Sequence, residues 1–434
     1  MLLFFSEGSI ASEWSILNNK KATSNSQFSR PIVLVCAILS LIIIQSLGNL
    51  SLIQGFIPND PVGNPWHLDA IKVHSVWDHG YSFYAPEAVG LCVIGEAIID
   101  DQNGDLNITE KASFSWDGNS SSYLPYPTSS SSSHEAAVAS VAASTINNGV
   151  GVAGIVNAPL YSAWPWGSYP VEDVTSYRIY LQKLMDIFDW GTSFGRMVFT
   201  MSFLATVYLL DFDDPVLVEL HNKVSELYEN GEALFFAGCD NILCPLHPKD
   251  VPQSLPYVRV IGRFDSTGTF NEGGYGEKLF LVGPAGGVPA YMQTTGNYGT
   301  FGGSSCSTPI VAASAVLLWN QFPWASNGQI EDALVWGATD ILNQGWDDRS
   351  GYGKLNVEKA REYLVEYIPS ANSYRLNWSN INHDPLTTTS GETTNGVASI
   401  LPLHVYVGIS IPIIVILLVL QAVIKRRETV SETV

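Results

Sequence analysis

The chain has 434 residues, of which 21 are lysine or arginine and 41 are aspartate or glutamate, so its formal net charge is −20 at pH 7. This charge argues against a nucleic-acid partner, because phosphate binding needs clustered cations. Hydrophobic residues make up 46% of the chain and charged residues only 14%, which suits a large folded core with added membrane spans. Five cysteines are too few for a disulfide framework.

Two long apolar runs lie near the ends of the chain, at residues 31–50 and 401–424. Each is close to the length that crosses a bilayer core of about 30 Å. Six of the basic residues flank the outer sides of these runs: Lys20, Lys21, Arg30, Lys425, Arg426 and Arg427. The positive-inside rule therefore predicts that residues 1–30 and 425–434 are cytoplasmic and that the region between the runs lies outside the cell membrane. The alternative for the first run is a cleaved signal peptide, which also exports the central region.

The central region, residues 57–368, alternates between predicted strands and helices. A polar segment rich in Ser, Thr and Asn, residues 369–400, follows it and predicts a flexible linker to the second span. In chain order the predicted elements are a strand at Val89–Ile94, helices at Ala136–Ser144 and Tyr180–Trp190, a strand at Met197–Met201, a helix at Leu217–Glu229, a strand at Ala233–Ala237 and a helix at Pro309–Trp319. This alternation predicts an α/β domain with a mostly parallel sheet covered on both faces. In such sheets function is expected at the carboxyl ends of the strands.

The sharpest chemical signal is the segment Gly303-Ser-Ser305-Cys-Ser-Thr-Pro309, just before an apolar helix. A serine held by a Gly-flanked turn at this place lies near the positive end of the helix dipole. Its hydroxyl is exposed for attack, and the dipole favours a developing oxyanion. Read from spacing alone, the same pattern also fits an ordinary helix cap.

The segment resembles the nucleophile motif of the subtilase superfamily of serine peptidases, Gly-Thr-Ser-x-(Ser/Ala)-x-Pro, with Ser304 in the Thr position. Four more landmarks that are similar to subtilase motifs occur in the expected order: Trp66–Gly80, His134–Val152, Pro256–Gly262 and Gly351–Asn356. The resemblance covers about residues 64–362 and implies a three-layer subtilisin-like domain. Three segments instead look like motifs of the sedolisin branch: Gly302–Pro309, Leu234–Asp240 and Gly345–Gly351. Sedolisins have Glu where this chain has His134, so the base is of the subtilisin type.

The resemblance implies that Ser305 is the nucleophile and that His134 acts first as general base and then as general acid. The acid of the triad is less clear. Subtilases have Val-Ile-Asp at the end of the first core strand, whereas this chain reads Val-Ile followed by Gly95 and Glu96. If Gly95 is an inserted bulge residue, Glu96 is the acid. If it is not, Gly95 replaces the acid and Glu96 is a solvated carboxylate.

The oxyanion donor also departs from the family pattern. Subtilases place an Asn after Ala-Gly, and in that register Cys239 stands there. The sedolisin register places Asp240 there instead. A carboxyl donates only when it is protonated, so an enzyme that uses Asp240 is expected to prefer mildly acidic pH. The Asp240→Asn substitution is then expected to shift the optimum upward.

Other features of the resemblance concern ions, thiols and the substrate groove. Asp105 and Asn148 match positions that hold a structural calcium in subtilisin-like members, and oxygen ligands suit this cation. No cofactor is required for the chemistry itself. Cys239 and Cys244 are placed to pair across a short loop. Bulkier residues in Ser202–Ala205 replace the Ser-x-Gly-Gly substrate strand, and Glu135 replaces the Gly that normally follows the catalytic histidine.

Two functions fit these observations. The first is a membrane-anchored subtilisin-like serine endopeptidase that hydrolyses polypeptide substrates through an acyl-enzyme. The second is a catalytically impaired subtilase-fold protein that serves as a binding or scaffold module. Ser305 and His134 favour the first function, whereas Gly95 and Cys239 favour the second.

Overall fold

The computed structural model describes residues 56–62, 65–95, 97–114, 132–165, 173–271 and 273–366. Their main feature is an eight-stranded sheet with the order β10-β8-β6-β4-β1-β3-β2, and β9 pairs with β8. The strands are β1 (Gly90–Ile94), β2 (Ile108–Ser113), β3 (Leu160–Trp164), β4 (Met197–Met201), β6 (Ala233–Gly238), β8 (Val258–Phe264), β9 (Phe270–Asn271) and β10 (Leu279–Pro284). Every pair along the main path is parallel, and only β9 runs antiparallel to its neighbour.

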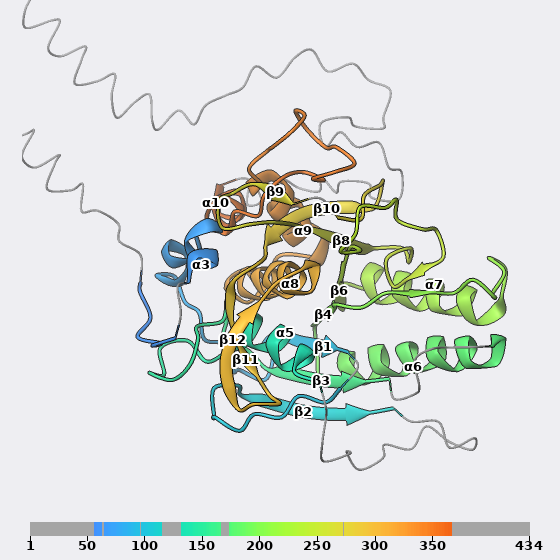
Figure 1. Cartoon of the computed structure of the whole chain (residues 1–434), viewed down its shortest axis with the longest axis horizontal. Coiled ribbons are helices and arrows are strands. Elements are labelled where there is room, and N and C mark those ends of the chain that lie inside the picture. Colours follow the sequence, from blue (N-terminus) through green and yellow to red (C-terminus); the bar gives the residue numbers. More distant parts are fainter. Residues whose placement is uncertain are drawn as a thin grey trace, which may run out of the picture. The chain divides into compact units, whose positions relative to one another are not determined.

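Helices cover both faces of this sheet. α5 (His134–Ala143) and α8 (Ser304–Gln321) lie on one face, and α6 (Val174–Thr192) and α7 (Pro215–Glu229) lie on the other (Figure 1). The central strands β1, β4 and β6 are therefore buried along their whole length, which explains their almost entirely apolar sequences. The three predicted strands and the α/β class with a mostly parallel sheet are confirmed.

The helix that carries the nucleophile motif begins earlier than predicted. α8 starts at Ser304, five residues before Pro309, so Ser305 is its second residue and does not precede it. The chain enters the helix through Gly303, whose φ of 77° lies in the left-handed region that favours glycine. Pro309 is tolerated because its missing N–H frees only the carbonyl of Ser305. That carbonyl instead accepts a hydrogen bond from Ser202 Oγ at 3.2 Å.

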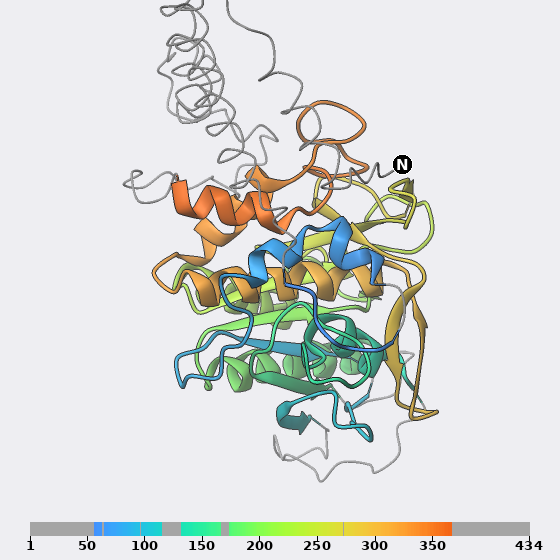
Figure 2. The same ribbon diagram turned by 90° about the vertical axis from the view of Figure 1, so that its left-hand side faces the viewer.

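Smaller elements complete the described part of the chain. They are α3 (Trp66–Ala70), α4 (Val73–Trp77), α9 (Asn327–Gly337), α10 (Val357–Glu366), the short strands β5 (Ala205–Thr206) and β7 (Asp250–Val251), and the hairpin strands β11 (Val288–Met292) and β12 (Asn297–Phe301). In Figure 2 the blue helices α3 and α4 lie beside the orange helices of the C-terminal part. A hydrogen bond of 2.9 Å from the N–H of Val357 to the carbonyl of Ile71 joins these two parts.

None of the helices within the described residues is long and apolar enough to cross a membrane. The two predicted spans, residues 31–50 and 401–424, lie outside the described residues. The predicted linker at 369–400 and the terminal segments 1–30 and 425–434 lie outside them as well.

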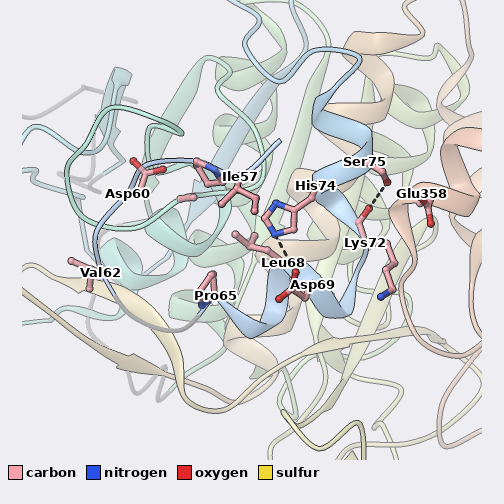
Figure 3. Close-up of a pocket in the computed structure, with 12 residues that line it drawn as sticks. Ile57, Asp60, Val62, Pro65, Leu68, Asp69, Lys72, His74, Ser75 and Glu358 are labelled. Atoms are coloured by element: carbon pink, nitrogen blue, oxygen red, sulfur yellow. Dashed lines mark hydrogen bonds and ion pairs between the residues drawn. The ribbon is translucent and has the colours of Figure 1, made fainter. Parts of the chain in front are cut away.

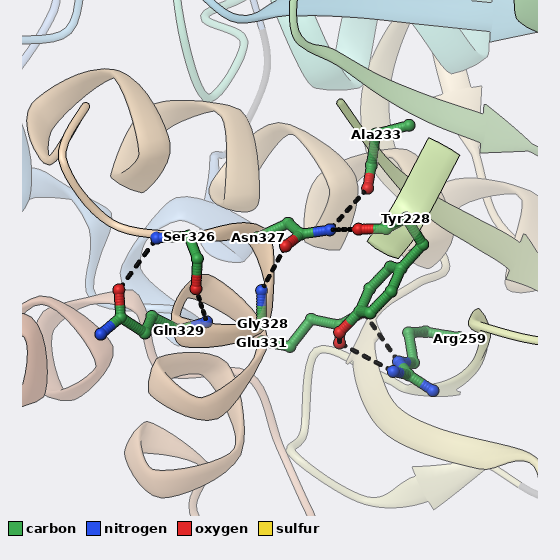
Figure 4. A network of polar contacts seen from close by, with 8 residues as sticks. All are labelled: Tyr228, Ala233, Arg259, Ser326, Asn327, Gly328, Gln329 and Glu331. Atoms are coloured by element: carbon green, nitrogen blue, oxygen red, sulfur yellow. Dashed lines mark hydrogen bonds and ion pairs between the residues drawn. The ribbon is translucent and has the colours of Figure 1, made fainter. Parts of the chain in front are cut away.

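A buried ion pair joins β8 to α9. Arg259 Nε and Nη2 each donate to a carboxylate oxygen of Glu331 at 2.7 Å, and Tyr228 Oη donates to Glu331 Oε2 at 2.6 Å (Figure 4). Glu331 is fully buried and Arg259 is 8% exposed. The guanidinium also lies over the rings of Tyr228 and Phe280, 5.7 Å from each centroid. Burial of a charge is costly unless it is paired, and here the bidentate geometry supplies the pairing.

His67 in α3 is a second buried titratable residue, and it differs from the ion pair in its polar contacts. The residue is 2% exposed, and neither ring nitrogen has a hydrogen-bond partner among the described residues. Burial, and to a smaller extent the nearby His74, lowers the pKa of His67 to about 3. The ring is therefore neutral in the folded protein at any pH above this value.

This environment predicts a pH-dependent stability. The pKa of His67 is lower in the folded state than in the unfolded state. The contribution of neutral His67 to the free energy of unfolding is therefore complete above about pH 6.5 and is lost as the pH falls toward 3. We expect that between pH 7 and pH 4 the wild-type chain loses about 3 kcal/mol more unfolding free energy than a His67→Leu variant. Urea unfolding at several pH values measures this difference, with His79→Gln as an exposed control. Parallel stability curves for wild type and His67→Leu would contradict the prediction.

Candidate functional site

The carboxyl ends of three neighbouring strands lie beside the first residues of two helices. Gly95, Ser202 and Cys239 directly follow the neighbouring strands β1, β4 and β6. Helices α5 and α8 pack against each other on one face of this sheet. The first residue of α5 is His134, and the second residue of α8 is Ser305. The carboxyl ends of parallel strands are the usual place for a functional site in such a sheet.

Ser305 is half-buried and is tied to the end of β4. Its Oγ donates to the carbonyl of Ser202 at 3.4 Å, and Ser202 Oγ donates back to the carbonyl of Ser305. As a first-turn residue of an 18-residue helix, Ser305 has a backbone N–H without an intrahelical acceptor. The hydroxyl and a free N–H therefore lie together at the positive end of the helix dipole.

The His134 imidazole is held from two sides. Its Nδ1 lies 3.0 Å from Glu135 Oε1, and its ring meets the ring of Phe301 edge-on with centroids 5.6 Å apart. Phe301 ends β12 and is only four residues before Ser305, so the imidazole lies beside the segment that carries the nucleophile. The His134 side chain is 38% exposed, which leaves part of the ring accessible.

Glu135 is a site residue that sequence reasoning did not assign to the catalytic machinery. Its side chain is 3% exposed, and it also accepts a hydrogen bond of 3.3 Å from Ser132 Oγ. A Cβ built on Gly95 would lie 2.3 Å from Glu135 Cγ, so the Glu135 side chain fills the space beside the end of β1. The sequence signal that could have identified Glu135 is the pair of departures from the family pattern at Gly95 and Glu135. Glu96 lies outside the described residues, and its role as the acid stays a prediction.

The segment after β6 presents a second unassigned residue, Asn241. Its Oδ1 accepts a hydrogen bond of 2.9 Å from the N–H of Ser304 and another from Arg263 Nη1. Its carboxamide lies against Gly303, since Nδ2 would be 3.3 Å from a Cβ built there. No acceptor for Nδ2 occurs among the residues that the structure describes. This nitrogen is therefore a donor that is available beside the Ser305 turn.

The two predicted oxyanion residues have other contacts. Asp240 Oδ1 accepts from the N–H of Ile242 at 3.0 Å, and Cys239 Sγ donates to the carbonyl of Asp240 at 3.3 Å. Burial raises the pKa of the Cys239 thiol to about 11, so it is a neutral group. The oxyanion role of Asp240, or of Cys239, stays a prediction. The expected pairing of Cys239 with Cys244 is wrong, because both thiols are free.

The predicted calcium ligands Asp105 and Asn148 contact each other. Asn148 Nδ2 donates to Asp105 Oδ1 at 3.1 Å, and Asp105 Oδ2 accepts from Tyr298 Oη at 3.0 Å and from the N–H of Val152 at 3.2 Å. Both carboxylate oxygens thus face hydrogen-bond donors, whereas a calcium site surrounds the cation with oxygen acceptors. In this arrangement the Asp105 oxygens are engaged by protein donors, and calcium binding by Asp105 and Asn148 stays a prediction.

A separate pocket of about 440 Å³ lies at the N-terminal part of the described chain. It is lined mainly by α3, α4 and the segment before them, with Glu358 at one side (Figure 3). Within it, His74 Nε2 lies 3.3 Å from Asp69 Oδ1. Its lining residues do not include Ser305 or His134, so the pocket is separate from the site described above.

Comparison with known proteins decides the family. The model of the Subtilase family, Peptidase_S8, matches residues 87–353, which is more than half of the chain. The chain belongs to the subtilase family. The resemblance seen in the sequence motifs is thereby confirmed, and the chain carries a subtilase-family protease domain.

Several subtilases are similar to this one over most of its length. It is 27% identical to Subtilisin E of Bacillus subtilis (strain 168) over 304 residues, which are 69% of this chain and 71% of that protein. It is 25% identical to the halolysin-like extracellular serine protease Nep of Natrialba magadii over 310 residues, which are 70% of this chain but about half (52%) of Nep. The solved structure of MycP1 from Mycobacterium smegmatis has the same fold, with a TM-score of 0.55, 16% identity and coverage of 71% of this chain and 87% of MycP1.

Proposed function

We propose that this subtilase is a membrane-anchored serine endopeptidase that hydrolyses peptide bonds outside the cell membrane through an acyl-enzyme on Ser305. The observation that carries the proposal is the pairing of two features at one sheet edge. Ser305 lies in the first turn of α8, and the His134 ring lies beside the segment that leads to it, with a carboxylate on its Nδ1. These are the groups that nucleophilic catalysis by a serine requires.

In the proposed mechanism Ser305 Oγ attacks the peptide carbonyl while His134 Nε2 takes the hydroxyl proton. The C–N bond of the tetrahedral intermediate then breaks as the imidazolium returns the proton to the leaving amine. Water attacks the resulting acyl-enzyme with the same assistance from His134 and releases the second product. Before a substrate binds, the hydrogen bond from Ser305 Oγ to the carbonyl of Ser202 orients the hydroxyl.

Charge that develops on the substrate oxygen needs donors near Ser305. We assign this role to the N–H of Ser305 and to Nδ2 of Asn241. The support for Asn241 is orientation: Arg263 and the N–H of Ser304 both donate to its Oδ1, so Nδ2 is the end of the amide that is left for a substrate. Asp240, the residue expected from the sequence, is the competing candidate.

The membrane part of the proposal rests on the sequence. The apolar runs at 31–50 and 401–424, with cations on their outer sides, favour two spans with cytoplasmic termini and an extracytoplasmic peptidase domain. Polypeptide substrates follow from the protease activity that the names of the relatives state. The chemistry proposed for Ser305 and His134 uses side chains and backbone groups alone.

A labelled fluorophosphonate tests the activity, because it reacts covalently with an activated serine. We expect the full chain to be labelled between about pH 7 and 8, because a histidine must be neutral to accept the Ser305 proton. Ser305→Ala should abolish the labelling, and the matched variant Ser225→Ala, in which a half-buried hydroxyl on α7 is removed, should not. A folded wild-type protein that is unlabelled from about pH 4 to 8 would reject the peptidase and favour the binding or scaffold module.

A further inference from the structure

The position of the triad acid is the point at which this chain departs most from its family. The subtilase pattern places an Asp directly after the first core strand and a Gly directly after the histidine. In this chain the two residue types are exchanged: Gly95 follows β1, and the acidic Glu135 follows His134. Each departure by itself removes or adds a carboxyl group. Taken together they leave the number of carboxyl groups at the two positions unchanged.

The structure brings the two departures into contact. A Cβ on Gly95 would lie 2.3 Å from Cγ, 2.8 Å from Oε1 and 2.9 Å from Cδ of Glu135. A side chain at position 95 and the observed Glu135 side chain therefore exclude each other. The carboxyl group of Glu135 lies in the space that an Asp at position 95 would enter, but it reaches that space from α5.

The same carboxyl group makes the contact that a triad acid makes. Glu135 Oε1 is 3.0 Å from His134 Nδ1, and Glu135 Oε2 accepts from Ser132 Oγ. With 3% of its side chain exposed, the carboxylate is shielded from water, so its interaction with the imidazole is little weakened by solvent. Nδ1 bound in this way keeps its proton, and Nε2 is then the nitrogen with the free lone pair.

We propose that Glu135 is the acid member of the triad, moved from the end of β1 to the helix that carries the base, and that Gly95 is the change that makes room for it. This inference rests on the proposed peptidase function. Glu135 is a positioning residue that acts through His134. In this role its carboxylate holds the Nδ1–H tautomer and stabilises the imidazolium that forms when Ser305 loses its proton.

The first test measures the rate constant for fluorophosphonate labelling of the full chain. Glu135→Gln preserves the shape of the side chain but removes the charge, and we expect labelling to slow by up to about 10⁴-fold, the loss seen when a triad acid becomes an amide. Glu110→Gln, which removes one exposed carboxylate elsewhere, is the matched control and should label at the wild-type rate. Melting temperatures of both variants show whether a slow rate reflects unfolding.

The second test returns the carboxylate to the strand. Gly95→Asp alone should label poorly, because the new side chain collides with Glu135. Glu135→Gly alone should also label poorly, because the acid is gone. The double variant Gly95→Asp/Glu135→Gly restores the family arrangement, and we expect it to label at least about tenfold faster than either single variant, a non-additivity expected of residues in contact and not of distant, independent ones.

The third test observes the imidazole directly. In protein labelled with ¹⁵N-histidine, the nitrogen spectrum assigned to His134 should report the Nδ1–H tautomer in wild type and a mixture in Glu135→Gln. Wild-type labelling that persists within threefold in Glu135→Gln, or a larger loss in Glu96→Gln, would overturn the inference. An unreactive wild-type protein would reject the peptidase function alone, and the nitrogen spectrum would then still decide whether Glu135 sets the tautomer.

Discussion

Replacement of Asn241 by alanine is expected to slow the labelling of Ser305 by about 10²–10³-fold, because the transition state for attack on the fluorophosphonate loses one of the two proposed donors to its charged phosphoryl oxygen. This magnitude is that of the oxyanion-hole asparagine in subtilisin, a member of the same family. Asn241→Asp separates donation from structure. It keeps an acceptor for the N–H of Ser304 and for Arg263 but lacks the Nδ2 donor, so it should be as slow as the alanine variant.

Substitution of Asp240 tests whether this residue, and not the neighbouring Asn241, is the oxyanion donor. Asp240→Ala and Asp240→Asn should label within a few-fold of the wild-type rate if Asn241 is the donor. A large loss in Asp240→Ala, together with an upward shift of the pH optimum in Asp240→Asn, would assign the oxyanion role to Asp240 instead. Wild-type labelling by Asn241→Asp would contradict the proposal for Asn241.

Neutralisation of Glu331 is expected to have the largest effect on stability. Glu331→Gln leaves the Arg259 guanidinium buried without its counter-charge, and the expected loss of unfolding free energy is about 3–5 kcal/mol. Urea unfolding of the full chain at pH 7, followed by tryptophan fluorescence, measures this loss. The partly exposed pair of Lys223 and Asp189 supplies the control, and Lys223→Gln should cost less than about 1 kcal/mol.

A double variant tests the physical reason for that loss. If it comes from an unpaired buried charge, Arg259→Met/Glu331→Leu should recover most of the stability, because neither charge remains. A double variant as unstable as Glu331→Gln would show that packing, and not charge, dominates at this place.

The fold was accessible from the sequence because its central strands are buried on both faces. Continuous apolar runs such as Met197–Met201 and Ala233–Ala237 have one favourable environment, and the structure places both there. The start of α8 was predicted five residues late, because proline usually marks a first turn. The carbonyl left free by Pro309 is satisfied by Ser202, a contact between residues 103 positions apart that no local pattern contains.

The site residues could be predicted from the sequence only where they stand in a recognisable motif. Ser305 and His134 stand in recognisable strings, and the structure places them on α8 and α5 at one sheet edge. Glu135 stands where the family has Gly, and Asn241 lies just beyond the two positions that the motif registers select, so motifs pass over both residues. Their assignment needs the contact of Glu135 with Gly95 and the orientation of the Asn241 amide, and both arise between segments that are distant along the chain.

The β11–β12 hairpin links helices α5 and α8 without passing through the main sheet. The N–H of Thr294 at its tip donates to Ser133 Oγ at 2.9 Å, the N–H of Tyr291 donates to Ser140 Oγ at 2.9 Å, and its second strand runs directly into α8. The hairpin thus attaches both ends of α5 to the segment that enters α8. A one-residue deletion in either hairpin strand is expected to shift the register of these contacts and so to move α5 relative to the start of α8.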